Sequence, residues 1–394
     1  SGWTRADYVE RLRYLKPNAE LRQEFQYNNL MYLTAGYLVE QLTDGTWEQA
    51  VRARILDPLG MEQTNFSVDS SQQTNDYALP YRESDGEIET MAFRNITTMG
   101  PAGSINSSVS EMTHWLRMLL NKGTFEGKQL LDPALVNDLH TSHMVTGRSS
   151  TRPELSAQTY GLGWFINSYR GHKHVSHGGN IDGFSALVTL FPDDGVGVIV
   201  LANKNATGLP SILTRHVADR VLELEPIDWN SEALKSRKQA EEAQETAEEK
   251  KGIARKKGTK PSHALEEYVG LYEHPGYGQL TVTRDGKQLS FVYNDISTPL
   301  EHWHYDVFNG LKAKDDVFED MKLIFRSDLN GNIAKVEAPF EPSVEHIEFT
   351  KQPDERYSDP LFLQKFTGKY ALADDTLSVT LAGNRLQLTI PGQP

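Results

Sequence analysis

The chain has 394 residues, and its 40 basic and 54 acidic side chains give a formal net charge of -14. This acidic balance argues against a nucleic-acid partner. The absence of cysteine excludes disulfides, cysteine metal sites and a cysteine nucleophile. No apolar run approaches the ~20 residues of a membrane span. A chain of this length is expected to form two or three domains. No cofactor is predicted, and no metal site, because the His pairs lack carboxylates at ligand spacing.

The first elements in chain order are helical. Apolar spacing predicts a helix from about Leu30 to Leu42, with Leu30, Leu33, Tyr37 and Leu38 on one face. Tyr27 and Asn29 then fall at or just before its first turn, and Asn29 is either the N-cap or a site residue. Residues 67–98 are expected to form a polar, irregular excursion. Capping and proline signals predict further helices over 46–55, from Ser110 to Leu120, after Asp132-Pro133, and over 209–224.

The stretch from His174 to Asn203 organises the first half of the chain. Two apolar runs, 184–191 and 196–202, flank a Pro-Asp-Asp-Gly turn, which predicts a β-hairpin. Both faces of each run are apolar, so the hairpin is expected inside a sheet that is covered on both sides. The segment before it should place His177 at the sheet edge. Glycines at 178, 179 and 183 would let backbone N–H groups approach a ligand closely.

The composition changes after residue 225. Residues 226–262 are rich in Glu, Lys and Ala and are expected to form a charged linker or a lone helix. Residues 263–352 alternate with period two, which predicts a small all-β domain. Residues 353–394 repeat its opening, because Phe366–Tyr370 has the aromatic-x-Gly-x-Tyr pattern of Tyr268–Tyr272. They are predicted to begin a second, incomplete β domain. Alternatively, they complete the first one.

Several short motifs occur together in the first half of the chain. They are Tyr27-x-Asn29, His177-Gly178-Gly179, Tyr160-Gly-Leu-Gly-Trp164 and Asp57-Pro-Leu-Gly-Met61. In this order and separation they resemble the serine β-lactamase and penicillin-binding-protein superfamily, and above all its class C-like esterases and peptidases. The resemblance implies an α/β (α+β) sandwich with an antiparallel sheet over residues 1–225. It also implies a lipocalin-like barrel after the linker and a periplasmic or secreted location.

The resemblance also implies roles for individual residues. Tyr27 would transfer protons and Asn29 would contact substrate. His177, Gly178 and Gly179 would line the edge strand, and the N–H of Asn180 would donate to an oxyanion. We therefore expect Tyr27, Asn29 and His177 to converge on one cleft. Without these roles, Tyr27 is a packed aromatic residue and His177 is a satisfied histidine at a strand end.

The superfamily's nucleophile motif, Ser-x-x-Lys, is absent. No serine in the chain has a lysine three residues later. In the superfamily this motif lies upstream of Tyr-x-Asn, so the sequence is interpreted as a fragment that lacks its nucleophile and is inactive by the covalent route. Tyrosine has a pKa of about 10 and is a poor base without a nearby cation.

Three functions remain open at this point. The first is a serine hydrolase that acts on small-molecule esters or peptides. The second is a non-catalytic, ligand-binding relative of the penicillin-binding proteins. The third is a β-barrel ligand-binding protein with the α/β part as scaffold. Because histidine is mostly neutral at pH 7, His177 favours a neutral ester or amide over a substrate with a free carboxylate. The oligomeric state stays open.

Overall fold

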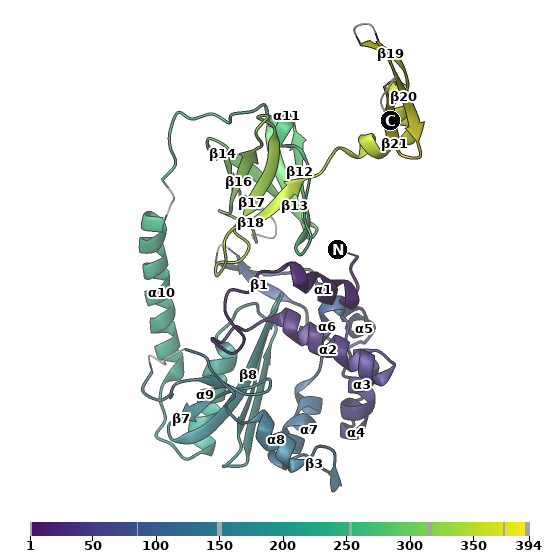
Figure 1. Ribbon diagram of the computed structural model, residues 1–394. Helices are drawn as coiled ribbons and strands as arrows, with labels where there is room; N and C mark the ends of the chain where they lie inside the picture. Colours follow the sequence, from purple (N-terminus) through teal and green to yellow (C-terminus); the bar gives the residue numbers. More distant parts are fainter. Residues whose placement is uncertain are drawn as a thin grey trace. The chain divides into compact units, whose positions relative to one another are not determined.

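The computed structural model describes residues 2–84, 86–147, 152–251, 254–313, 317–372 and 375–390 (Figure 1). Its contacts divide the chain into two units. One consists of Gly2–Glu10 and Ala19–Lys251, and the other of Arg11–Asn18 and Gly252–Pro394. Among the described residues, no helix combines the length and the apolar character needed to cross a membrane.

A six-stranded antiparallel sheet forms the centre of the first unit. Its order is β10-β9-β8-β7-β6-β5. The bounds are β5 Met144–Val145, β6 Thr159–Tyr160, β7 Phe165–Tyr169, β8 His172–Ile181, β9 Phe184–Phe191 and β10 Val196–Ala202. The predicted hairpin is confirmed, because β9 and β10 pair with Val196 opposite Phe191. Its predicted place inside the sheet is wrong for β10, which is the end strand of the described sheet.

Helices cover both faces of this sheet, as the apolar pattern predicted. Helix α7 (Val109–Leu120) packs on β10, where Leu116 and Leu120 lie against Gly197. Helix α9 (Leu209–Val221) packs on β9 and β10 from the other side. Helix α10 (Trp229–Lys251) occupies most of the predicted linker. It begins with the buried Trp229, which packs in a cluster with residues of β7, β9 and α9.

The predicted helix over Leu30–Leu42 is confirmed as α2 (Asn29–Thr43), with two corrections. Its N-cap is Asn28, whose side chain accepts a hydrogen bond from the Leu30 N–H, and not Asn29. Leu38 is 56% exposed. The buried face contains Gly36 instead, because a Cβ there would lie 2.2 Å from Pro101. The side-chain pattern therefore missed a packing contact that glycine makes possible.

The other helices follow the predictions in part. The predicted cap Ser110 is wrong, because Ser108 caps α7. Asp132 caps α8 as expected. The polar stretch 67–98 contains a short helix and a hairpin, β1–β2, rather than irregular chain alone. The bounds are α1 Arg5–Arg11, η1 Leu12–Tyr14, α3 Trp47–Val51, η2 Arg52–Leu56, α4 Asp57–Leu59, α5 Val68–Gln72, β1 Tyr81–Ser84, β2 Glu87–Thr90, η3 Thr97–Met99, α6 Gly100–Gly103, β3 Thr124–Phe125, β4 Lys128–Gln129 and α8 Pro133–Leu139.

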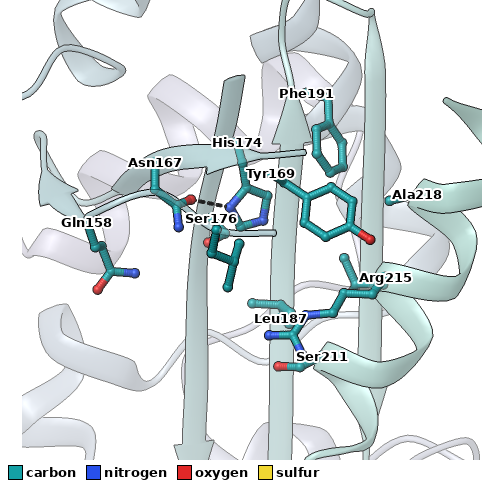
Figure 2. A pocket seen from close by; sticks show the side chains of 12 residues that line it. Gln158, Asn167, Tyr169, His174, Ser176, Leu187, Phe191, Ser211, Arg215 and Ala218 are labelled. Carbon is teal, nitrogen blue, oxygen red and sulfur yellow. Dashed lines mark hydrogen bonds between the residues drawn. The ribbon is translucent and has the colours of Figure 1, made fainter. Parts of the chain in front are cut away.

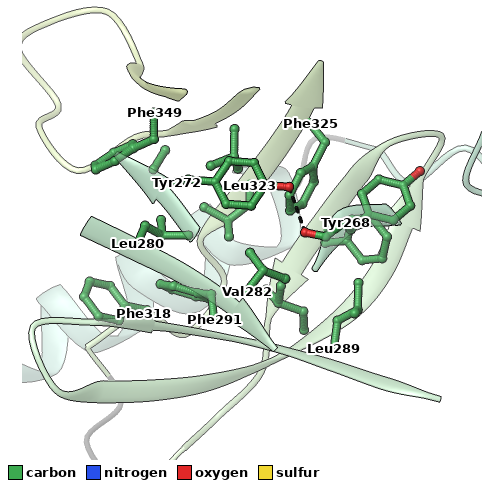
Figure 3. Packing of buried hydrophobic residues seen from close by; sticks show 14 of the residues in the cluster. Tyr268, Tyr272, Leu280, Val282, Leu289, Phe291, Phe318, Leu323, Phe325 and Phe349 are labelled. Atoms are coloured by element: carbon green, nitrogen blue, oxygen red, sulfur yellow. Dashed lines mark hydrogen bonds between the residues drawn. The ribbon is translucent and has the colours of Figure 1, made fainter. Parts of the chain in front are cut away.

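The second unit contains the predicted barrel, which closes from β11 to β18. Large side chains fill its interior, including Tyr272, Phe291, Phe325 and Phe349 (Figure 3). A filled interior speaks against the third function, which needs a ligand cavity. The bounds are α11 Leu265–Tyr268, β11 Gly270–His274, β12 Gly278–Asp285, β13 Gln288–Tyr293, β14 Ile296–His304, β15 Val307–Gly310, β16 Lys322–Ser327, β17 Ile333–Ala338 and β18 Ile347–Lys351.

The C-terminal strands repeat the opening of the barrel in detail. Tyr272 donates its hydroxyl to the carbonyl of Tyr268 at 2.7 Å, and Tyr370 donates to that of Phe366 at 2.8 Å. The three strands form a sheet of their own, so they do not complete the barrel. That they begin a second β domain stays a prediction. The bounds are η4 Glu355–Ser358, α12 Pro360–Leu363, η5 Gln364–Phe366, β19 Gly368–Leu372, β20 Asp375–Ala382 and β21 Arg385–Thr389.

Candidate active site

Strand β8 extends beyond its neighbour β7 and leaves one edge open. Pairing with β7 ends where Phe165 lies opposite Ser176, whereas β9 pairs with β8 as far as Ile181. Residues 177–181 therefore have a strand partner on one side only within the described sheet. His177 is the first residue of this segment, at the sheet edge where the sequence placed it. An unpaired edge presents backbone donors and acceptors to whatever lies beside it.

The glycines near this edge divide into two kinds. A Cβ on Gly178 or Gly179 would meet only ordinary contacts, at 3.5 Å or more. Gly183 has a φ of +87°, and a Cβ there would lie 2.2 Å from Pro80. Gly183 is therefore required by the turn and by packing rather than by a ligand. Internal packing does not explain Gly178 and Gly179, so close approach of a ligand stays a prediction for these two.

Tyr27 lies next to His177, as predicted, despite their distance in the sequence. The ring centroids of the two residues are 5.8 Å apart, and the Tyr27 ring stacks on Phe165 at 6.5 Å. Tyr27 is 44% exposed. No described residue donates to or accepts from its hydroxyl. This hydroxyl is therefore free to bind a ligand.

Three other side chains beside Tyr27 form a hydrogen-bonded chain. The Tyr32 and Tyr160 hydroxyls are 2.5 Å apart, and the Tyr160 hydroxyl lies 3.2 Å from His177 Nε2. His177 Nδ1 lies 2.8 Å from the carbonyl oxygen of Gly178. Because a carbonyl can only accept, Nδ1 carries the proton and Nε2 accepts from Tyr160. The Tyr160 oxygen then accepts from Tyr32. Both ring nitrogens of His177 therefore have hydrogen-bond partners within the protein.

The environment keeps these groups neutral at pH 7. Burial raises the pKa of Tyr27, and the neighbouring Tyr32 raises it further. Burial also raises the pKa of Tyr160, together with its hydrogen bond to Tyr32. Burial lowers the pKa of His177, against the effect of the Gly178 carbonyl. No lysine or arginine of the described residues lowers the pKa of Tyr27, so the described site does not make Tyr27 a base.

An open pocket of about 540 Å³ adjoins this cluster. Its wall includes Tyr27, Tyr32, Tyr160 and Asn28. His177 contacts the rings of Tyr27 and Tyr160 but does not line the pocket. Asn29 is exposed in the first turn of α2 and does not line the pocket either. The structure therefore brings Tyr27 and His177 together, and it places Asn28 rather than Asn29 at the pocket. The role predicted for Asn29 finds no support in this geometry.

Asn180 ties the end of β8 to the loop that follows β10. Its Oδ1 accepts hydrogen bonds from the Ser185 hydroxyl at 2.9 Å and from the Ala206 N–H at 2.6 Å. Its Nδ2 donates to the Asn205 side chain at 3.2 Å. The side chain is thus structural. The oxyanion role concerns the backbone N–H and stays a prediction.

The sequence analysis assigned no role to Tyr32 or Tyr160. Tyr160 begins the Tyr-Gly-Leu-Gly-Trp motif, which carried the resemblance but no function. Tyr32 follows Tyr27 at a helical spacing, which indicates a shared region but no partner. Only the fold shows that the two hydroxyls meet across 128 positions of the sequence.

An antiparallel sheet with helices on both faces, and a tyrosine at a helix start beside an open strand edge, defines a β-lactamase-type domain. The β-lactamase family matches residues 1–222, and the chain belongs to this family, as the motifs predicted. A domain of unknown function, DUF3471, matches residues 254–351, which span the barrel.

Two curated relatives and one solved structure illustrate the similarity. The chain is 30% identical over 310 residues to unguisins hydrolase ungD' of Aspergillus campestris, covering 75% of this chain and 56% of the relative. It is 28% identical over 193 residues to protein flp of Staphylococcus aureus, covering 48% and 36%. The octameric penicillin-binding protein homologue from Pyrococcus abyssi has a TM-score of 0.48 at 20% identity, covering 84% of this chain and 66% of that chain. The chain spans about half the length of the unguisins hydrolases that it matches, 56% and 53%.

Proposed function

We propose that this chain forms the substrate cleft of a serine hydrolase, in which Tyr27 transfers a proton during cleavage of an ester or amide through an acyl-enzyme. One observation carries this proposal: the ring of Tyr27, whose hydroxyl has no partner among the described residues, lies against His177 at the open edge of β8. Membership of a hydrolase family supports it, as does a relative named as a hydrolase of unguisins. Gly178 and Gly179 would let the substrate backbone lie against the edge.

Acyl-enzyme chemistry in this family requires a nucleophile motif that the printed sequence lacks. The printed sequence has no Ser-x-x-Lys, and no cation among the described residues lowers the pKa of Tyr27. A lysine beside Tyr27 would lower that pKa and let the tyrosine accept a proton. We therefore propose that the 394 residues by themselves form no acyl-enzyme.

The cleft suits a neutral substrate with apolar or aromatic groups. Aromatic rings form much of its wall, including Tyr27 and Tyr160, and the Arg and Glu side chains that also line it, Arg22 and Glu24, carry opposite charges. His177 is neutral at pH 7 and uses both nitrogens inside the protein, so it offers no positive charge to a carboxylate. We propose that an ester or a peptide amide is bound here in preference to a β-lactam or a free-carboxylate peptide.

A non-catalytic, ligand-binding protein is the second candidate. The raised pKa of Tyr27 favours it, because such a tyrosine donates a hydrogen bond to a ligand and does not take up a proton. The two functions differ in whether a covalent intermediate forms.

Labelling with a fluorophosphonate probe distinguishes them. The 394-residue chain and the product of the complete gene are each treated with the probe and with a chromogenic short-chain ester, and labelled peptides are mapped by mass spectrometry. We expect labelling and turnover only in the gene product, at the serine of a Ser-x-x-Lys motif. A gene product that is neither labelled nor active would favour the binding protein. Labelling of a serine within the 394 residues would show that the nucleophile has been misassigned.

A further inference from the structure

A second cavity lies on the opposite face of the same sheet. His174 and His177 are three residues apart on β8, so their side chains leave opposite faces. The cavity on the His174 side has a volume of about 200 Å³. Figure 2 shows it between strands β7–β9 and helix α9, with Asn167, His174 and Arg215 along its wall. It is separate from the proposed cleft.

Arg215 brings an uncompensated positive charge to this cavity. Its guanidinium lies over the Trp229 ring at 5.0 Å. No described carboxylate lies within ion-pair distance, and no described atom accepts from its N–H groups. By contrast, Arg170 nearby pairs with Asp219 at 2.9 Å. An arginine has five donors that fit carboxylate or phosphate oxygens, and here they have no acceptor in the described chain.

The surroundings of Arg215 do not supply the missing anion. Burial lowers its pKa, and the charge of Arg152 lowers it further, while Tyr169 and Glu154 oppose this at longer range. Arg152 lies over the same Trp229 ring at 5.7 Å and pairs with Glu232. A bound anion would relieve the repulsion between the two guanidinium groups.

Two residues that line the same cavity as Arg215, Thr214 and Ser211, carry hydroxyl groups without hydrogen-bond partners in the described structure. Thr214 is 2% exposed, and its Oγ1 has no hydrogen-bond partner in the described structure. A buried hydroxyl without a partner is costly, so its presence beside a cavity indicates a ligand that accepts from it. Ser211, one helical turn from Arg215, also lines the cavity, and its hydroxyl has no partner among the described residues. Figure 2 shows Arg215 and Ser211 together on α9.

The rest of the wall is neutral or apolar. His174 Nδ1 donates to Asn167 Oδ1 at 2.6 Å, and burial lowers the pKa of His174 to about 4. Leu155, Leu187 and Phe191 supply apolar surface. A cavity of ~150 Å³ suffices for a benzene-sized molecule, so this one accommodates a short chain with a charged end.

We propose that this cavity binds the carboxylate of a small aliphatic acid, with Arg215, Thr214 and Ser211 as donors. The guanidinium would take the carboxylate oxygens, the hydroxyls would donate to their remaining lone pairs, and the alkyl chain would lie against Leu187 and Phe191. Arg152 pairs with Glu232 and does not line the cavity, so Arg215 alone faces the ligand there; one guanidinium matches one negative charge, which favours a carboxylate over a phosphate dianion. This site is independent of the proposed hydrolase activity.

The test measures binding of sodium butyrate to the 394-residue chain by calorimetry at constant ionic strength, with chloride as the reference anion. Arg215→Gln removes the charge, and with it the guanidinium contact to the Trp229 ring, but keeps part of the aliphatic stem and a polar end. Arg220→Gln is the matched control, because Arg220 is exposed on the same helix. We expect saturable binding to the wild type and to R220Q, and at least about tenfold weaker binding to R215Q.

Thr214→Val is a second variant that does not depend on the folding of R215Q. Valine removes the unpartnered hydroxyl at nearly constant shape, so we expect equal or higher thermal stability with weaker butyrate binding. Binding should also raise the pKa of His174, followed by NMR, because the charge of Arg215 now lowers it. Equal butyrate affinity in wild type and R215Q would overturn the proposal. So would binding of inorganic phosphate without butyrate.

Discussion

Strand β8 carries one histidine on each face of the six-stranded sheet, and the two histidines have different neighbours. On one face of β8, His177 is held by Tyr160 and by the Gly178 carbonyl beside an open cleft. On the other face, His174 is held by Asn167 beside a cavity that contains an unpaired guanidinium. Burial lowers the pKa of both histidines. Burial alone therefore does not distinguish the two faces. The groups around each histidine do: tyrosine hydroxyls on one side and a cation on the other.

Among the variants on the side of the sheet that α9 covers, Asp219→Ala should lose the most stability. This buried carboxylate accepts hydrogen bonds from Tyr169 at 2.5 Å and Trp229 at 2.7 Å, and it pairs with Arg170. Asp219→Ala would leave these donors unpaired, so we expect a loss of about 3–5 kcal/mol in the free energy of unfolding. Urea unfolding measures it. Asp193→Ala, at an exposed turn position, should change stability by less than about 0.5 kcal/mol. Equal losses in both variants would contradict the assignment.

The pH dependence of stability tests the buried histidine on the same face. The pKa of His174 is about 4 in the fold, against an ordinary value of 6.5. As the pH falls, the unfolded chain therefore takes up this proton first. Stability should decrease from about pH 6.5 to pH 4, by roughly 3 kcal/mol for this residue. His140, whose pKa burial also lowers to about 4, adds a similar decrease.

Urea unfolding at pH 7 and pH 4.5 checks this prediction. His174→Gln should reduce the wild-type decrease by roughly 3 kcal/mol, while His140, His177 and the other groups with lowered pKa values still contribute. A variant with the same decrease as the wild type would show that His174 is not buried as described.

The smallest changes in stability are expected for the tyrosines of the cleft face. Tyr160→Phe breaks the chain between Tyr32 and His177 and should cost about 1 kcal/mol. Tyr27→Phe removes a hydroxyl without a protein partner and should leave stability nearly unchanged. Thermal unfolding of both variants provides the measurement. A larger loss for Y27F than for Y160F would reverse the roles given to the two hydroxyls.

Local sequence was sufficient for elements whose pattern repeats at close range. The β9–β10 hairpin, helix α2 and the cap Asp132 were predicted from apolar spacing and turn residues. The C-terminal strands make the same point, because the pattern around Tyr370 forms the hydrogen bond seen at Tyr272. Burial differs, since Tyr272 is 0% exposed and Tyr370 is 45% exposed. A local pattern thus predicts strands, whereas closure of the barrel decides what they cover.

Contacts across long sequence distances were not predictable in the same way. The motif spacing brought Tyr27 and His177 together correctly. It could not show that the Tyr160 hydroxyl forms a hydrogen bond with His177, or that Gly36 packs on Pro101. Helix boundaries also failed by one or two residues, because Asn28 and Ser108 are as good caps as Asn29 and Ser110. No motif indicated the cavity at Arg215, because its wall combines three strands, helix α9 and a loop that only the fold brings together.

The turnover number of the Tyr27→Phe variant tests the central claim most directly, measured in the protein that the fluorophosphonate probe labels. If Tyr27 transfers the proton, the loss of its hydroxyl should lower kcat for a chromogenic ester by about 10²–10⁴-fold, with stability retained. Tyr37→Phe, on helix α2, which begins two residues after Tyr27, should keep wild-type kcat. A Y27F variant that retains kcat within a few-fold of the wild type would contradict the account.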